Sequence, residues 1–288
     1  MTIRNAVHSL ENDLTMVRSL VREAGDIVRV YHDRQDEIDW KGTDAGGRRT
    51  DPVTAADHAV NAFLVEHLRA AFPEDGILAE ESKDNEERLG KRRVWCIDPL
   101  DGTKEFIARN GEFSIMVGLA VDGVAALGVV YQPVQDFMYS GLREVGAWMD
   151  ETPLHVSPIE TPAEMRLVVS RSHRNPITDA IKATLGVTQE RISGSVGLKC
   201  GLIARGEADL YLHPAPGTKE WDTCAPEAIL TGAGGKMTDC WGRPLVYNQR
   251  DVARHGGIVA SNGRAHHRII SLMIPRLAEA GIEAEVGW

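Results

Sequence analysis

The sequence predicts a layered α/β fold built around a mixed β-sheet. Helical and strand-like patterns alternate through both halves of the 288-residue chain. Hydrophobic residues make up 43% of the sequence, which is enough for a sizeable core in one large domain or two closely joined ones. Two apolar runs flank Asp122-Gly123, a dipeptide typical of a tight β-hairpin. These three observations favour helices packed against a sheet over an all-helical or all-β fold.

The first part of the chain carries two amphipathic helices with a polar stretch between them. Apolar residues recur at helical spacing over residues 10–31. The glycine-rich segment 41–52, KGTDAGGRRTDP, is expected to form a mobile loop. A second helix is expected to start near Thr54 and to end before Pro73.

Short apolar runs then predict a series of strands. They cover residues 77–79, 94–97, 114–121, 124–131, 137–140, 145–149 and 167–170. A connector around Pro162 leads into the second half, where helices are expected over 179–185, 196–204, 223–231 and 266–280, with strands at 210–212 and 258–260. This alternation is what indicates the layered α/β arrangement.

The composition excludes several classes of protein. The formal charge of −10 and the absence of a basic tract argue against a nucleic acid polymer as partner. The sequence contains no run of 18 apolar residues, so no membrane span is expected, and the first residues lack the apolar centre of a signal peptide. The four cysteines form no CxxC pair, which favours reduced structural thiols in the cytoplasm, with a single catalytic cysteine as the alternative.

Acidic residues from distant parts of the sequence stand at strand ends or helix starts. They are Asp57, Glu80, Asp98, Asp101 and Asp222. Functional sites of α/β proteins collect at the ends of strands. We therefore expect these side chains to form one acidic corner that holds cations against a phosphate, since an acidic protein needs such compensation to bind a phosphate ester.

The stretch VWCIDPLDGTKEF, residues 94–106, is the centre of this corner. Asp98 and Asp101 lie on a turn stiffened by proline and can converge on one cation, with the Leu100 carbonyl as a further hard oxygen ligand. A helix that starts at Thr103 would leave the backbone N–H groups of Gly102 and Thr103 free to meet a phosphate oxygen. The alternative is an ordinary Asp-Gly turn with an aspartate cap.

Glu80 and Asp57 have plausible structural roles as well. Glu80 and Glu81 leave a strand side by side and should point to opposite sides, so one can face the corner while the other meets solvent or a structural partner. The alternative for both is a solvated loop. Asp57 fits either a capping box with Thr54 or an acid that orients the attacking water.

Asp222 begins the last acidic motif. As the N-cap of the helix that follows, it would satisfy free backbone N–H groups. In the functional interpretation the same carboxylate faces a metal ion, and Trp221 is buried beside it and keeps water out.

Other chemistries find little support. The chain contains no HExxH, GxSxG or GxxxxGK[ST] motif, and its ten histidines show no metal-ligand spacing. His266 and His267 are expected on an exposed helix surface. Ligands that are all oxygen favour magnesium over zinc, and two cations can activate a water on one side of a phosphate while they stabilise the leaving oxygen on the other.

Four motifs in this order resemble the inositol monophosphatase superfamily of lithium-sensitive, magnesium-dependent phosphatases. They are DPVTAAD, LAEES, WCIDPLDGTKEF and EWDTCAPEAILTGAGG, within a similarity that runs from about residue 17 to 265. DGTKEF followed by RNGEFS and SRSH is similar to the CysQ-type 3′(2′),5′-bisphosphate nucleotidases. The resemblance implies an αβαβα sandwich of the inositol monophosphatase and fructose-1,6-bisphosphatase type, often dimeric. Residues 1–156 would carry most metal ligands and residues 157–288 would complete the site.

The resemblance also implies a set of metal ligands. Glu80, Asp98 and the Leu100 carbonyl would bind one magnesium ion, and Asp98, Asp101 and Asp222 would bind a second. A third, weaker ion would join through Glu80 and waters.

The same resemblance assigns catalytic and phosphate-binding roles. Asp57 and Thr103 match the pair that positions the attacking water, and Gly102 and Thr103 match the backbone cradle for phosphate. Glu80 is also expected to take part in catalysis, and Asp222 to contact the substrate. The implied reaction converts 3′-phosphoadenosine 5′-phosphate to AMP and phosphate, in sulfate assimilation or general nucleotide salvage.

Residues that would choose the substrate depart from the nucleotidase pattern. His213 follows the strand tyrosine where inositol-specific members have an acid and nucleotidases often have arginine. Lys199 matches a nucleotidase lysine, but Val196 replaces a serine, with Ser195 one position earlier. The candidates for substrate binding are His173, Lys199 and His213, each of which could instead be a surface or core polar residue.

Two other functions stay open at this stage. One is an inositol monophosphatase or a broader sugar-phosphate phosphatase. The other is an inactive, metal-bound regulator or phosphate-binding protein, against which the complete set of predicted ligands argues.

Overall fold

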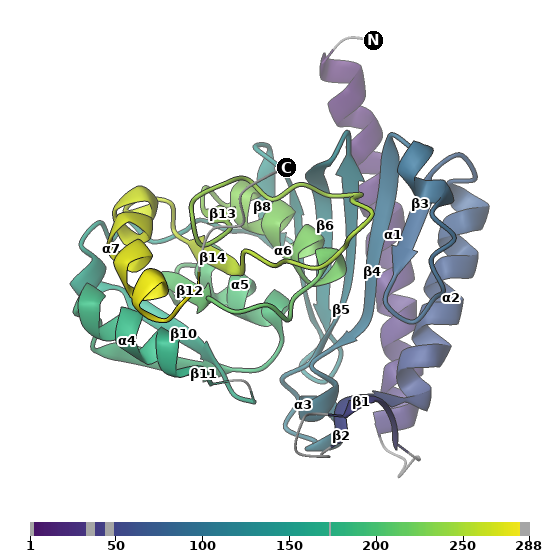
Figure 1. Cartoon of the computed structure of the whole chain (residues 1–288). Coiled ribbons are helices and arrows are strands. Elements are labelled where there is room, and N and C mark those ends of the chain that lie inside the picture. The colour runs from purple at the N-terminus through teal and green to yellow at the C-terminus, as the bar shows by residue number, and fades with distance from the viewer. Residues whose placement is uncertain (1–2, 33–37, 44–48, 173, 283–288) are drawn as a thin grey trace.

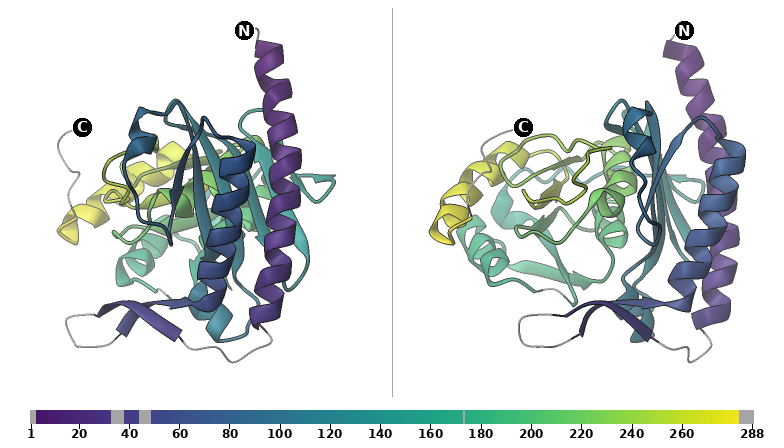
Figure 2. Two further views of the ribbon diagram at one scale, coloured as in Figure 1. Left: turned by 90° about the vertical axis from the view of Figure 1, so that its right-hand side faces the viewer. Right: turned by 45° about the vertical axis from the view of Figure 1, so that its right-hand side comes forward.

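A computed structural model describes residues 3–32, 38–43, 49–172 and 174–282, and these residues stack into five layers (Figures 1 and 2). Two helices cover the outer face of a large sheet, two lie between the sheets, and two cover the outer face of a smaller sheet. In that order they are α1 (Ile3–His32), α2 (Ala55–Ala71), α5 (Val196–Ala204), α6 (Glu220–Gly232), α4 (Pro176–Leu185) and α7 (His266–Glu279). The predicted layered αβαβα sandwich is confirmed.

The large sheet has the strand order β3-β4-β5-β6-β7-β8-β9. Only β3 and β4 run parallel, and the other neighbouring pairs are antiparallel. Its strands are β3 (Gly76–Ala79), β4 (Arg93–Asp101), β5 (Ser114–Val121), β6 (Val124–Gln132), β7 (Phe137–Leu142), β8 (Gly146–Met149) and β9 (Thr152–Pro153). Asp122 and Gly123 both have positive φ, 50° and 78°, so the predicted hairpin turn between β5 and β6 is confirmed.

The smaller sheet has the strand order β11-β10-β12-β14-β13. Strand β10 runs parallel to both of its neighbours, while β14 runs antiparallel to β12 and β13. Its strands are β10 (Arg166–Ser170), β11 (Gln189–Ser193), β12 (Leu210–His213), β13 (Lys236–Thr238) and β14 (Ile258–Ser261). Short helical pieces α3 (Thr103–Ile107), η1 (Glu87–Gly90) and η2 (Pro162–Glu164) complete the described elements.

Three apolar clusters hold the layers together. The first joins α1 and α2 to the outer face of the large sheet, the second surrounds α5 and α6 between the sheets, and the third joins α4 and α7 to the smaller sheet. Each layer therefore buries its apolar face against the next, as alternating helices and sheets require. None of the described helices has the length and apolar character needed to cross a membrane.

A row of three glycines lets α6 lie directly on the large sheet. Gly118, Gly128 and Gly141 face one another in register on β5, β6 and β7. A Cβ on Gly118 would stand 2.6 Å from Ala225 N, one on Gly128 would overlap the Ala225 carbonyl, and one on Gly141 would stand 2.7 Å from Ile229 Cα. Side chains in this glycine row would push α6 off the sheet.

Three sequence expectations need correction. Segment 41–52 is not a loop throughout, because its ends belong to the antiparallel strands β1 (Ile38–Thr43) and β2 (Arg49–Thr54), while residues 44–48 lie outside the described residues. His266 is not exposed: it is 3% exposed and lies between the hydroxyls of Thr238 and Ser261, whereas His267 is exposed. Helix starts are also earlier than expected, by three residues in α4 and α6 and by seven residues in α1.

Candidate active site

A pocket of about 670 Å³ gathers most of the predicted site residues. It lies where the ends of β3 and β4 meet α3, the first turns of α5 and α6, and the end of β12. The predicted residues among its lining are Glu80, Asp98, Leu100, Asp101, Gly102, Thr103, Lys199, His213 and Asp222. Positions separated by more than one hundred residues in sequence thus share one cavity.

Asp98 and Asp101 reach the pocket through an irregularity in β4. The sequence predicted that this strand ends before both residues. It instead runs through them, and its register against β5 shifts between them. Asp98 Oδ1 accepts the Leu100 N–H at 3.0 Å. Asp101 Oδ2 accepts the Ser195 hydroxyl at 2.5 Å and the Gly197 N–H at 3.0 Å. The register shift places two acids of one strand in the same cavity.

Asp222 comes from the first turn of α6. The sequence offered the N-cap position as the alternative to a metal-facing role. Asp222 is instead the third helical residue after the cap Lys219, whose N–H donates to Asp222 Oδ2 at 2.6 Å. Trp221 is 8% exposed beside it, as expected. The Asp222 carboxyl lies close enough to that of Asp98 for the two to interact. Two carboxyl groups in such contact must share a proton unless a cation replaces it.

The acids of the pocket repel one another. Burial raises the pKa of Asp98 well above its usual value, and the charges of Glu80, Asp101 and Asp222 raise it further. Burial likewise raises the pKa of Asp222 to about 8, with Glu80 and Asp101 adding to the effect. Burial also raises the pKa values of Glu80 and Asp101, which Lys41 and Lys199 respectively oppose. The pocket therefore concentrates negative charge that protons or cations have to balance.

The chemistry of these donors fits a hard divalent cation. All are carboxylate or carbonyl oxygens, the ligand type that Mg²⁺ prefers. Within the described ranges, no three acidic, histidine or cysteine side chains already stand as a ready ligand set. Asp98, Asp101 and Asp222 instead accept hydrogen bonds from protein groups. The residues fit Mg²⁺ by donor type and convergence, and small side-chain rotations would be needed to bind it.

The sequence predicted that Glu80 and Glu81 point to opposite sides, with one facing the corner. Of the two, Glu80 lines the pocket, but both side chains reach the same lysine. Both contact the ammonium group of Lys41, Glu80 at 3.2 Å, and the Glu81 side chain is the more buried of the two. Lys41 lines the pocket beside Glu80. Lys41 lies in β1 and therefore brings a positive charge into the acidic corner. No sequence pattern revealed this charge, because the position of β1 depends on its pairing with β2.

Asp57 combines the two roles that the sequence left open. Its Oδ2 accepts the Thr54 N–H at 2.8 Å and the Thr54 hydroxyl at 2.6 Å, so it caps α2. Its Oδ1 lies 3.3 Å from Thr103 Oγ1, which also lies 3.2 Å from the Leu100 carbonyl. Burial raises the pKa of Asp57 to about 6, against the lowering effect of Thr54. One carboxylate oxygen therefore caps the helix, and the other contacts Thr103, which lines the pocket.

The three candidates for substrate binding differ in their placement. Lys199 is 2% exposed, donates to the Gly194 carbonyl at 3.3 Å and lies 5.0 Å from the centre of the Tyr211 ring. Burial lowers its pKa, an effect that Asp101 opposes. His213 lines the pocket at the end of β12, and His173 lies outside the described residues.

Sequence reasoning missed the role of Ser195. This residue has a φ of 48°, caps α5 by accepting the Leu198 N–H, and donates to Asp101. A serine before a helix is a normal cap signal, but its contact with Asp101 spans 94 residues. All four cysteines are buried and free, and burial raises the pKa of Cys200 to about 12, which does not fit a catalytic thiolate.

The fold and the acidic pocket together define a phosphatase-type architecture, and comparison with known proteins identifies the family. The family model described as "Inositol monophosphatase family" matches residues 9–274. The chain belongs to the inositol monophosphatase family.

Within this family the chain is similar to proteins named 3′(2′),5′-bisphosphate nucleotidase CysQ. It is 38% identical to the one from Shigella flexneri and 39% identical to the one from Escherichia coli K12. Each similarity runs over 250 residues, which is 86% of this chain and 99% of the relative.

Solved structures agree with this placement. The CysQ structure from Bacteroides thetaiotaomicron superposes with a TM-score of 0.73 at 28% identity, covering 88% of this chain and 97% of that one. The inositol monophosphatase from Anabaena gives a TM-score of 0.75 at 28% identity, covering 93% of this chain and 97% of that one. Both belong to the same layered fold.

Proposed function

We propose that this chain is a magnesium-dependent phosphomonoesterase that hydrolyses 3′-phosphoadenosine 5′-phosphate to AMP and phosphate. The observation that carries the proposal is the convergence of Glu80, Asp98, Asp101 and Asp222 on one pocket in a chain 39% identical to a CysQ nucleotidase. Water supplies the new P–O bond, the P–O3′ bond breaks, and the ribose oxygen takes a proton.

Five groups would hold the cations. Glu80, Asp98 and the Leu100 carbonyl suit one Mg²⁺, and Asp98, Asp101 and Asp222 suit a second, with a third, weaker ion through Glu80. When bound, such ions neutralise phosphate charge and polarise the attacking and leaving oxygens. The mutual repulsion of these acids, which raises their pKa values, supports this role because cations would relieve it.

Asp57 and Thr103 would orient the attacking water. When the Thr103 hydroxyl donates its proton to Asp57 Oδ1, the Thr103 oxygen presents a lone pair to a water in the pocket. The pKa of about 6 leaves the Asp57 carboxylate ionised above neutral pH, so it can accept that proton. The backbone N–H groups of Gly102 and Thr103 would meet the phosphate oxygens.

The pocket has room for a nucleotide. A volume of about 670 Å³ falls within the range of small-molecule sites. Lys199, His213 and His173 are the proposed contacts to the rest of the substrate, and Asp222 would also approach the leaving oxygen. We further propose that the protein works in the cytoplasm, without membrane or nucleic acid partners, and forms a homodimer.

A comparison of substrates tests the proposal. Phosphate release would be measured from 3′-phosphoadenosine 5′-phosphate, inositol 1-phosphate and fructose 1,6-bisphosphate, each with Mg²⁺ and with EDTA. We expect the nucleotide to give the highest kcat/KM and EDTA to abolish turnover. Faster release from inositol 1-phosphate would replace the assignment with an inositol phosphatase, and no turnover of any ester would indicate a phosphate-binding protein.

A further inference from the structure

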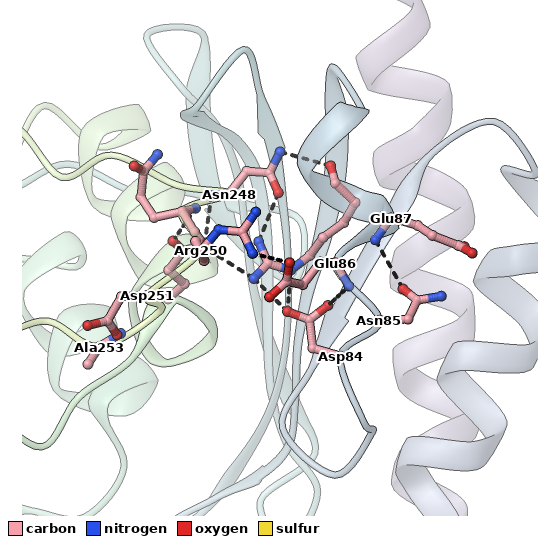
Figure 3. Close-up of polar contacts among 11 residues, drawn as sticks. Asp84, Asn85, Glu86, Glu87, Asn248, Arg250, Asp251 and Ala253 are labelled. Carbon is pink, nitrogen blue, oxygen red and sulfur yellow. Dashed lines mark hydrogen bonds and ion pairs between the residues drawn. The ribbon is translucent and has the colours of Figure 1, made fainter.

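A buried arginine joins two segments that are far apart in the sequence. Arg88 in η1 is 2% exposed. Its guanidinium donates to Asp84 Oδ2 at 3.0 and 2.7 Å, to Asn248 Oδ1 at 2.9 Å and to the Gln249 carbonyl at 3.0 Å. Figure 3 shows this junction, with Asp84 on one side and Asn248 on the other. The arginine thus fixes the loop after residue 247 against the large-sheet half.

Asn248 passes this constraint on in both directions. Its Nδ2 donates to the Arg88 carbonyl at 2.9 Å and to the Lys91 carbonyl at 3.3 Å, and its φ of 63° suits asparagine. Its own N–H donates to Glu220 Oε2 at 2.7 Å, and the Gln249 N–H donates to Glu220 Oε1 at 2.8 Å. Both oxygens of the Glu220 carboxylate are therefore occupied by one turn of the loop.

Glu220 is the first residue of α6 and is fully buried. Its N–H donates to the Val252 carbonyl at 3.0 Å, and Lys219 pairs with Ala253. The first turn of α6 is therefore held by a loop that Arg88 anchors to the opposite half. Asp222 stands two residues further along that turn.

We propose that Arg88, Asn248 and Glu220 are positioning residues for Asp222. They form a relay that fixes the first turn of α6 and so sets the place of the Asp222 carboxylate opposite Asp98. The inference rests on the proposed function, because it takes Asp222 as a cation ligand. Ligand sites lose affinity when their supporting hydrogen bonds are removed, typically about 10–100-fold.

The glycine row alone does not set this position. The atoms nearest to these glycines belong to the middle of α6, at Ala225 and Ile229 among others, and not to its first residues. The relay holds the first turn of α6 through buried hydrogen bonds, which restrict geometry more tightly than exposed contacts do.

Two substitutions test the relay. Asn248→Gly removes the side chain and keeps a residue at ease with positive φ. Glu220→Gln keeps the shape but puts an amide donor against one of the two backbone N–H groups. If either variant fails to fold, Arg88→Lys takes its place, since lysine cannot reproduce the fork of hydrogen bonds.

Two control variants accompany them. Arg250→Ala breaks the ion pair with Glu86, which crosses the same junction (Figure 3) but is exposed and should matter little. Arg166→Gln removes the partner of the buried Asp209 in the smaller sheet, so it lowers stability without touching the relay.

Three measurements separate positioning from mere stability. They are the Mg²⁺ dissociation constant by calorimetry well below the unfolding temperature, hydrogen exchange of the peptide covering residues 219–225, and kcat and KM for the ester. We expect Asn248→Gly and Glu220→Gln to weaken Mg²⁺ binding about 10–100-fold, to speed exchange in that peptide and to lower kcat more than they raise KM. Both controls should keep wild-type Mg²⁺ affinity.

The outcomes that overturn the inference are distinct. Wild-type Mg²⁺ affinity in both relay variants, with only a lower unfolding temperature, would make the network purely structural. A wild-type protein that binds no Mg²⁺ and hydrolyses no ester overturns the proposed function instead. In that case, unchanged hydrogen exchange at 219–225 in the variants would also overturn the relay. Faster exchange would show that the relay fixes the first turn of α6, without a role in cation binding.

Discussion

The Thr103 hydroxyl lies 3.3 Å from Asp57 Oδ1 and joins the first residue of α3 to the first turn of α2. We predict that Thr103→Val lowers kcat by about 100-fold or more, within the range of general acid–base effects. Mg²⁺ affinity should change little, because neither residue is a proposed ligand. Steady-state kinetics at varied Mg²⁺ would measure both quantities.

Thr103→Ser is the matched control, since it keeps the hydroxyl and should retain most activity. Equal loss in the valine and serine variants would assign Thr103 a packing role in place of a catalytic one.

Asp98→Asn should abolish activity in a folded protein. Asp98 is the proposed bridge between two cations, and an amide oxygen cannot balance their charge. We expect kcat/KM to fall more than about 100-fold, beyond the usual cost of a residue that only supports a ligand. Circular dichroism would verify the fold, and Asp122→Asn in the exposed hairpin turn is the control. Wild-type turnover at saturating Mg²⁺ would contradict the bridging role.

Asp222→Asn should stabilise the cation-free protein at alkaline pH. The folded pKa of Asp222 is raised to about 8, whereas the unfolded value is about 3.9. Between about pH 4 and pH 8 the folded state therefore binds a proton at Asp222 that the unfolded state lacks. The stability of the folded state falls as the pH rises through this range. Asparagine has no such proton to lose.

Thermal unfolding in EDTA tests this sign. The melting temperature of the variant relative to wild type should rise from pH 4 to pH 8 by a few degrees, and the comparison cancels titrating groups outside the pocket, such as the buried His266. With excess Mg²⁺ the order should reverse, because the wild type gains binding energy that the variant lacks. A difference in melting temperature that does not change with pH would show that the pKa of Asp222 is not raised in the folded protein.

Gly128→Ala should destabilise the protein and impair the site together. The added methyl group would overlap the Ala225 carbonyl of α6, and overpacking of this kind costs about 1–3 kcal/mol. Chemical denaturation would measure the free energy of unfolding, and kinetics would report the displacement of Asp222. Gly90→Ala is the control, because a Cβ at Gly90 meets nothing within 4 Å. Equal stability of the two variants would contradict the close packing of α6 on the glycine row.

Local sequence patterns predicted the elements whose signals are local. The hairpin at Asp122-Gly123 follows from residues that accept positive φ, and α5 has the predicted bounds Val196–Ala204. The convergence of acids at strand ends was also predictable, because α/β sheets place such ends together. Their roles as ligands stay a prediction until cations are bound.

Features that depend on distant contacts could not be predicted. The start of α6 was misplaced because its cap is Lys219, a residue without the usual cap side chain, and because Glu220 is also held by the distant backbone N–H groups of Asn248 and Gln249. Lys41 escaped notice because β1 gains its structure only from pairing with β2. His266 was assigned to the surface since helical periodicity alone does not reveal that Thr238 and Ser261 lie beside it.

The seat of α6 on the glycine row has a consequence for how the protein is made. Strands β5, β6 and β7 leave the ribosome long before α6, and the loop that holds Glu220 follows later still. The acidic pocket needs all of these segments, so Asp222 can join the other acids only after the loop that holds Glu220 has emerged. A nascent chain that stops before residues 248–249 would therefore lack the contacts that hold the first turn of α6 beside the other acids.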